Sequence, residues 1–152
     1  MTSRLSHTLA ADTLGHLGID LVPEPQQITP SEGVFRPGEA APVALLEDAD
    51  DEDRFAAEDL AASLRSEHGI QATVTDRLQA DVPVIKLRRS PGDALRTEGY
   101  ALAVEPNAVT LEGSDAAGLF WGTRTLLQAF RRGPRGPEVP CMRVEDWPDL
   151  RY

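Results

Sequence analysis

The sequence predicts an α+β fold, in which two helices pack on one face of a mixed or mainly antiparallel sheet. Three observations predict it. Two amphipathic helical segments begin near residues 51 and 116, and short stretches typical of strands surround them. The resulting order is strands, helix, strands, hairpin, helix and strand. Because strands and helices do not alternate strictly, a doubly wound parallel sheet fits less well.

The first part of the chain is expected to supply extended segments. Residues 1–20 are weakly patterned, although residues 12–17 could form one helical turn. Residues 21–25 contain two prolines, and a residue before a proline is disfavoured from the helical region, which predicts extended structure. Residues 33–37 are typical of a short edge strand closed by its proline. Residues 42–47 form an apolar run of strand length.

The first helix is expected to run from an N-cap at Asp50 or Asp51 to about Glu67, with Gly69 as its left-handed cap. The acidic run at residues 48–53 would complement the helix dipole. A calcium loop is the alternative, but the run lacks the central glycine and terminal glutamate of such loops. The predicted apolar face consists of Phe55, Ala56, Ala57, Leu60, Ala61 and Leu64.

Strands and a hairpin are expected in the middle of the chain. Residues 70–75 and 84–87 are β-branched or apolar, and residues 76–83 and 88–97 read as loops. Residues 100–104 alternate between large and small side chains. Pro106 and Asn107 supply a turn, and Val109 and Leu111 lie on the returning strand.

The second helix is expected from an Asp115 cap to about Arg131, followed by a break at residues 133–137 and a strand at residues 139–144. Gly118 and Gly122 are interpreted as the places where this helix approaches the sheet. Phe120 is expected to be almost fully buried. The other residues of the predicted apolar face are Ala116, Leu119, Thr123, Leu126, Leu127 and Phe130, and of these Leu127 is expected to be as buried as Phe120.

Charge and cysteine content exclude several function classes. The formal net charge is −10, which argues against nucleic acid and anionic membranes as partners. No apolar run approaches the roughly 18 residues of a membrane span. No signal peptide is visible, so the compartment of the parent protein, cytoplasmic or secreted, stays open. Cys141 is the only cysteine; it cannot form an intrachain disulfide and is expected to be a small buried side chain in a strand.

No residue pattern predicts catalysis. The sequence contains no phosphate-binding loop, dinucleotide fingerprint, paired-histidine zinc motif or nucleophile elbow. Glu145 and Asp146 are adjacent, so on a strand they would point to opposite faces and could not act on one glycosidic bond. We expect Asp146 to accept backbone hydrogen bonds near the turn at residues 147–148. The sequence therefore predicts no catalytic, cofactor-binding or metal-binding residue.

Several segments together resemble a known domain. They are EGYALAV at residues 98–104, VTLEG at 109–113, DAAGLFWG at 115–122, TLLQ at 125–128, LVPEPQ at 21–26 and VEDWPDLRY at 144–152. This pattern resembles the accessory domain that precedes the catalytic barrel in β-N-acetylhexosaminidases of glycoside hydrolase family 20. The resemblance covers about residues 20–152. Similar front domains occur in O-GlcNAcase-like and α-glucuronidase enzymes, so these families stay open as alternatives.

The resemblance implies that a catalytic barrel carries out the reaction and that this chain is an accessory domain beside it. It implies a tail at residues 1–20, an accessory domain at 21–144, and the start of a connection to the barrel at 145–152. The Asp-Glu pair that does the chemistry in the resembled enzymes has no counterpart here. The domain would instead pack against the barrel and stabilise it, through an apolar patch on its sheet or helices. Without the barrel, weak self-association of the chain is expected.

An independent carbohydrate-binding module is the main alternative from another class, and an unrelated interaction domain is a third. Carbohydrate-binding modules present exposed aromatic side chains to sugar rings. Here Trp121 and Trp147 are the only plausible platform. The other aromatic side chains considered, Phe55, Tyr100, Phe120 and Phe130, fall on predicted buried faces.

Overall fold

The computed structural model describes residues 14–38, 40–46, 49–78, 81–90 and 95–148. Its two long helices are α2 (Asp51–His68) and α3 (Ala116–Ala129). The strands are β1 (Gln27–Phe35), β2 (Ala40–Leu45), β3 (Gln71–Thr75), β4 (Val84–Arg89), β5 (Tyr100–Glu105), β6 (Ala108–Gly113), β7 (Arg131–Gly133) and β8 (Gly136–Asp146). Within the described ranges, no helix is long and apolar enough to cross a membrane.

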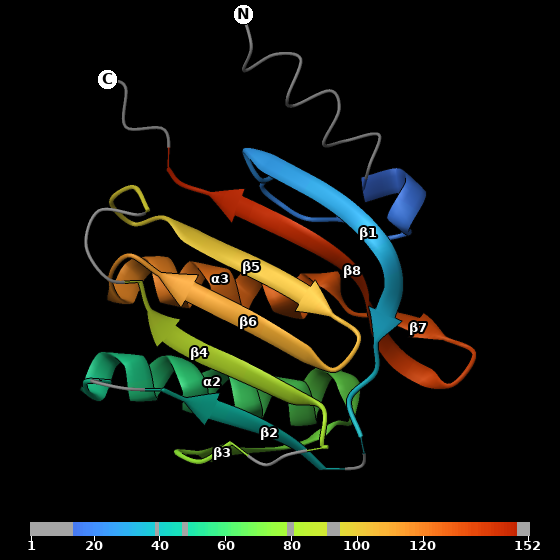
Figure 1. Ribbon diagram of the computed structural model, residues 1–152, viewed down its shortest axis with the longest axis horizontal. Coiled ribbons are helices and arrows are strands. Elements are labelled where there is room, and N and C mark those ends of the chain that lie inside the picture. Colours follow the sequence, from blue (N-terminus) through green and yellow to red (C-terminus); the bar gives the residue numbers. More distant parts are fainter. Residues whose placement is uncertain (1–13, 39, 47–48, 79–80, 91–94, 149–152) are drawn as a thin grey trace, which may run out of the picture.

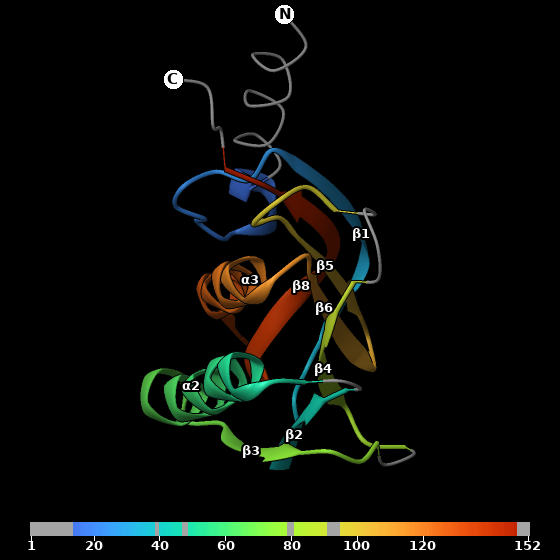
Figure 2. The same ribbon diagram turned by 90° about the vertical axis from the view of Figure 1, so that its left-hand side faces the viewer.

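The predicted α+β fold is confirmed. The sheet is mixed, with the order β1-β8-β5-β6-β4-β2-β3, and the short β7 pairs with β8 (Figure 1). Strands β1, β8, β5 and β6 pair antiparallel, whereas β6, β4, β2 and β3 pair parallel. Figure 2 shows both long helices on the same face of this sheet. The core therefore lies between one helical layer and one sheet layer.

The predicted hairpin is present as β5 and β6. Glu105 pairs with Ala108, so Pro106 and Asn107 form a two-residue turn as expected. The large side chains Tyr100, Leu102 and Val104 on β5, and Val109 and Leu111 on β6, are buried on the helical side. Alternation along these strands thus identified the core face correctly.

Helix α2 begins and ends where the sequence predicted. Asp50 is its N-cap and forms a capping box with Asp53, and Gly69 adopts the left-handed conformation at the other end. The predicted burial of Phe55 is wrong, because this side chain is 64% exposed. Phe55 precedes the central buried Leu60 by five residues, which places it far around a helix that turns about 100° per residue.

Helix α3 buries most of the apolar face that the sequence predicted, including Thr123 and Phe130, but it does not bury Phe120. Leu119, Leu126 and Leu127 are buried, but Phe120 is only partly buried, so its predicted near-complete burial is wrong. The two glycines explain the difference. A Cβ at Gly122 would lie 2.4 Å from Leu111 Cδ1, and one at Gly118 would lie 2.1 Å from the Gly99 carbonyl oxygen. The predicted close approach at both glycines is thereby confirmed, and it sets the rotation of α3.

The end of α3 leads into a hairpin that the sequence did not predict. The helix ends at Ala129. Residues 133–137, expected only to break the helix, include the end of β7, the turn at 134–135 and the start of β8. Gly133 pairs with Gly136, whose φ of +110° suits glycine. Buried Glu138 at the start of β8 forms an ion pair with Arg131. This pair joins the two strands of the short hairpin to each other.

Residues of the expected N-terminal tail contribute to the core. Residues 14–17 form a helical turn, and Leu14 and Ile19 are buried with Leu21. Strand β1 is an edge strand, as expected, but it begins at Gln27 instead of residue 33. Parts of several predicted segments lie outside the described residues. They are residues 1–13 and 149–152 at the two ends, residues 47–48 where the acidic run begins, and residues 79–80 and 91–94 in the predicted loops.

Candidate functional site

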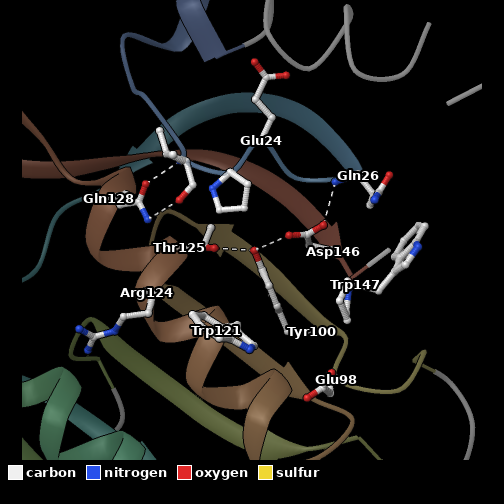
Figure 3. A pocket seen from close by; sticks show the side chains of 13 residues that line it. Glu24, Gln26, Glu98, Tyr100, Trp121, Arg124, Thr125, Gln128, Asp146 and Trp147 are labelled. Atoms are coloured by element: carbon white, nitrogen blue, oxygen red, sulfur yellow. Dashed lines mark hydrogen bonds between the residues drawn. The ribbon is translucent and has the colours of Figure 1, made fainter. Parts of the chain in front are cut away.

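A cavity of about 620 Å³ opens beside α3, where the chain leaves the end of β8. Figure 3 shows its lining from close by. The lining combines four separate segments: the stretch before β1, the start of β5, one side of α3, and the end of β8. The lining residues are Val22, Pro23, Glu24, Gln26, Glu98, Tyr100, Trp121, Arg124, Thr125, Gln128, Asp146, Trp147 and Pro148.

Helix α3 contributes a second stripe of side chains to this cavity. Trp121, Thr125 and Gln128 follow one another at spacings of four and three residues, which places them on one side of a helix. This side is distinct from the one that packs on the sheet. Trp121 is 54% exposed and lies along the cavity. This stripe was not predicted from the sequence because Thr125 and Gln128 are polar, although the spacing was a usable signal.

Hydrogen bonds hold both ends of the segment before β1 in place. The Gln128 side chain accepts a hydrogen bond from the Val22 backbone N–H at 2.7 Å and donates one to the Val22 carbonyl oxygen at 3.2 Å. The Asp146 carboxylate accepts a hydrogen bond from the Gln26 backbone N–H at 3.0 Å. The wall that this segment forms is therefore attached to α3 at one end and to β8 at the other.

A buried phenol connects the remaining walls. The Tyr100 hydroxyl lies 2.5 Å from the Thr125 hydroxyl and donates a hydrogen bond to Asp146 at 3.5 Å (Figure 3). Burial raises the pKa of Tyr100 well above its ordinary value, and the nearby Asp146 carboxylate acts in the same direction. The phenol therefore stays protonated at neutral pH. When it donates this proton to Asp146, its oxygen accepts the hydrogen bond from the Thr125 hydroxyl.

The rim of the cavity carries more negative than positive charge. Glu24, Glu98 and Asp146 are acidic, and Arg124 is the only basic residue among the described residues of the lining. Arg124 forms an ion pair with Asp59 of α2, so part of its charge is already compensated. On the other side of the rim, the Trp147 ring is covered by the Arg96 guanidinium at 4.4 Å from the ring centroid.

The residues weighed in the sequence analysis have structural roles. Asp115 is the N-cap of α3, accepting from the Gly118 N–H, and it also accepts from the Glu98 N–H. Glu145 forms an ion pair with Arg143, whereas Asp146 faces the cavity, so the two carboxylates point to opposite sides as expected. The backbone hydrogen bond that Asp146 accepts comes from Gln26, and this donor lies far from the predicted turn in sequence.

Cys141 is buried in β8, as predicted. Burial also raises the pKa of its thiol. Among the described residues, no group of three or more His, Cys, Asp or Glu side chains could hold a metal ion. The capping interpretation of the acidic run is confirmed for Asp50 and Asp53, which form the capping box and both pair with Arg89.

The geometry of the cavity fits binding better than catalysis. Most of its polar side chains are already engaged: Gln128 by Val22, Thr125 by Tyr100, and Arg124 by Asp59. Its remaining surface is largely apolar, with Trp121 as the largest exposed side chain. A preformed apolar hollow with a few fixed polar groups is typical of a binding site.

Comparison with known proteins finds similar solved structures that cover most of this chain. A β-hexosaminidase from Streptomyces plicatus is similar at 29% identity and a TM-score of 0.70, covering 86% of this chain and 26% of that one. A family 20 enzyme from Streptomyces coelicolor A3(2) is 28% identical, with a TM-score of 0.69 and coverage of 83% and 26%. A family 20 exo-β-N-acetylglucosaminidase from Vibrio harveyi is 25% identical, with a TM-score of 0.71 and coverage of 88% and 19%. A search of curated proteins found no match.

The chain thus spans 19–26% of the length of these similar enzymes. The family model described as glycosyl hydrolase family 20, domain 2, matches residues 18–147. The resemblance found in the sequence is confirmed, because both the family model and the solved structures cover most of the chain. This chain therefore belongs to the domain family described as glycosyl hydrolase family 20, domain 2.

Proposed function

We propose that this chain is the non-catalytic accessory domain of a β-N-acetylhexosaminidase-like glycoside hydrolase, and that it packs against the catalytic domain and stabilises it. The family match and the short share of each similar enzyme that the chain covers support this role. The single observation that carries the packing role is the difference between the two outer faces of the domain. One face is polar, and the other exposes large aromatic side chains.

The open face of the sheet is suited to water. Arg88 and Glu112 form an ion pair at 3.0 Å, and Arg143 and Glu145 form another at 3.0 Å. The pairing register places these residues on the side of the sheet away from Leu111, which contacts the helical layer. A face with such ion pairs gains little from being covered by another domain.

The helical face is suited to a partner. Phe55 of α2 and Trp121 of α3 are both more than half exposed. Asp59 of α2 and Arg124 of α3 join the two helices by an ion pair, and the Arg124 guanidinium lies 5.0 Å from the centre of the Phe120 ring. Exposed aromatic side chains on one face are typical of a protein interface. An interface between domains commonly buries about 600–1,500 Å².

The test compares three proteins: this chain alone, the full polypeptide that contains it, and the catalytic domain without it. We expect the full polypeptide to release the aryl group from an aryl N-acetyl-β-glucosaminide, and this chain alone to show no turnover above a heat-inactivated control. We expect the catalytic domain alone to unfold at a lower temperature than it does in the full polypeptide, since it loses its interface. Turnover by this chain after repurification, or equal thermal midpoints, would contradict the proposal.

A further inference from the structure

The cavity beside α3 has properties that the accessory role alone does not require. Its walls are held by hydrogen bonds at both ends of residues 22–26, so it does not need a ligand to form. Trp121 is nevertheless left 54% exposed along it. A rigid hollow with an uncovered tryptophan is typical of a place where a partner inserts a side chain.

The location of the cavity restricts the partner. Strand β8 ends at Asp146, and Trp147 and Pro148 then form part of the cavity rim. Any polypeptide that continues beyond this point is tethered beside the opening. A tethered segment has a high effective concentration, so it competes favourably with a free ligand or with a second copy of the chain.

The chemistry of the cavity restricts the partner further. A saccharide needs many hydrogen-bonding partners, but the amide of Gln128 and the hydroxyls of Tyr100 and Thr125 already bond within the wall. The Glu98 carboxylate lies at the rim with no hydrogen-bond or ion-pair partner among the described residues. The remaining surface thus offers an aromatic face beside a negative charge, which favours an apolar side chain next to a basic one.

We propose that this cavity seats a segment of the catalytic domain of the same polypeptide, which places a large apolar side chain on Trp121 and a lysine or arginine towards Glu98. This inference rests on the proposed accessory role and assigns that role its main contact. Trp121 is the anchor of the interface, and Glu98 selects the charge of the partner. The segment at residues 22–26 is the preformed wall against which the partner closes.

The first experiment identifies the occupant directly in the full polypeptide. A photoreactive benzophenone amino acid replaces Trp121 in one protein and Leu78 in the other. Leu78 is a matched control, because it is 53% exposed but follows β3 at the opposite edge of the sheet. After irradiation, we expect position 121 to form a cross-link to the catalytic domain within one molecule, and position 78 to form none. A cross-link between two molecules, or no cross-link at position 121, would overturn the proposal.

The second experiment measures how firmly the domains dock, by hydrogen exchange of α3 in the full polypeptide. We expect Trp121→Ala to raise the exchange rate of the backbone amides on the outer side of α3 by about tenfold or more. We expect Glu98→Gln to raise this rate less. Leu78→Ala is expected to leave the rate unchanged. Variants at Trp121 and Glu98 that exchange like the wild type would overturn the cavity as the contact. The accessory role would survive that result if the full polypeptide still stabilises its catalytic domain.

The third experiment tests a saccharide as the rival occupant. The 152-residue chain is titrated with N-acetylglucosamine oligomers while its tryptophan fluorescence is recorded. We expect no saturable change. A saturable change that disappears in Trp121→Ala would assign the cavity to a saccharide and overturn the proposal.

Discussion

At the scale of single residues, Asp146 and Tyr100 hold the candidate site together. Asp146 accepts hydrogen bonds from the Gln26 backbone and from the Tyr100 hydroxyl, and Tyr100 also bonds to Thr125 on α3. Four segments that are distant in sequence therefore meet at one carboxylate and one phenol. Because hydrogen bonds in a buried network support one another, the loss of one member is expected to loosen the whole wall.

Replacement of Tyr100 tests this network through its pH dependence. The pKa of the phenol is raised in the folded state, so the unfolded state loses its proton first, near pH 10. The stability from Tyr100 is thus complete below about pH 10 and falls as the pH rises further, by up to about 1.4 kcal/mol per pH unit. In Tyr100→Phe, we expect a loss of about 1–3 kcal/mol at pH 7 and a shallower decline above pH 10.

Urea unfolding of both proteins between pH 7 and pH 11 provides the measurement. The thiol of Cys141, whose pKa burial also raises, contributes to the alkaline decline of both proteins. The difference between the two slopes therefore isolates Tyr100. Equal slopes above pH 10 would show that the folded state does not disfavour ionisation of this phenol.

At the scale of elements, the glycines of α3 decide which of its sides enters the core. Gly118 approaches the Gly99 carbonyl, and Gly122 approaches Leu111, so closely that no side chain fits between them. This contact turns Leu119 and Leu126 into the core and leaves Phe120 at the edge of the helical layer, beside Arg124. The same rotation points Trp121 into the cavity, so the packing of α3 and the geometry of the site have one cause.

Alanine substitutions on α3 measure this rotation. Leu119 is fully buried, so Leu119→Ala is expected to cost about 2–5 kcal/mol of unfolding free energy. Phe120 is the larger side chain, but Phe120→Ala is expected to cost less than Leu119→Ala because Phe120 is only partly buried. Chemical denaturation of both variants checks the order. A larger loss for Phe120→Ala would place that ring in the core and contradict the rotation.

At the scale of the whole molecule, the domain has a polar sheet face, a helical face with exposed aromatic residues, and a chain exit beside its cavity. Trp147 lies at this exit, outside any helix or strand, and its ring is partly covered by Arg96. Its cation–π contact contributes on the order of 0.5–1 kcal/mol. The connection was predicted at residues 145–152, but Glu145 and Asp146 belong to β8. Residues 147–152 are expected to matter more for contacts between molecules or domains than for the fold of this chain.

Deletion of residues 147–152 tests that expectation in the isolated chain. Because Trp147 is only partly buried and Pro148 is exposed, we expect the thermal midpoint to fall by no more than about 2–4 °C. Weak self-association of the intact chain is expected, since aromatic surface near the exit is uncovered, and the deletion should reduce it in sedimentation velocity runs. A truncated chain that fails to fold would place Trp147 in the core of this domain instead of at an interface.

Local signals in the sequence were sufficient for most elements. The caps at Asp50 and Asp115 and the turn at Pro106 and Asn107 depend on hydrogen bonds and backbone preferences within a few residues. The alternation of large side chains in the hairpin likewise identified a core face without knowledge of the partner. Such features are visible in sequence because the residues that cause them are neighbours in the chain.

Contacts over long sequence distances were decided only by the tertiary structure. The burial of Leu14 and Ile19 depends on elements that follow much later, and the side that α3 buries depends on Gly99 and Leu111. The cavity was not predicted at all, because its walls come from four segments. The sequence by itself determined most of the elements, the family and the excess of negative charge. The tertiary structure decided the orientation of α3 and the site, because both depend on which distant surfaces fit together without a clash.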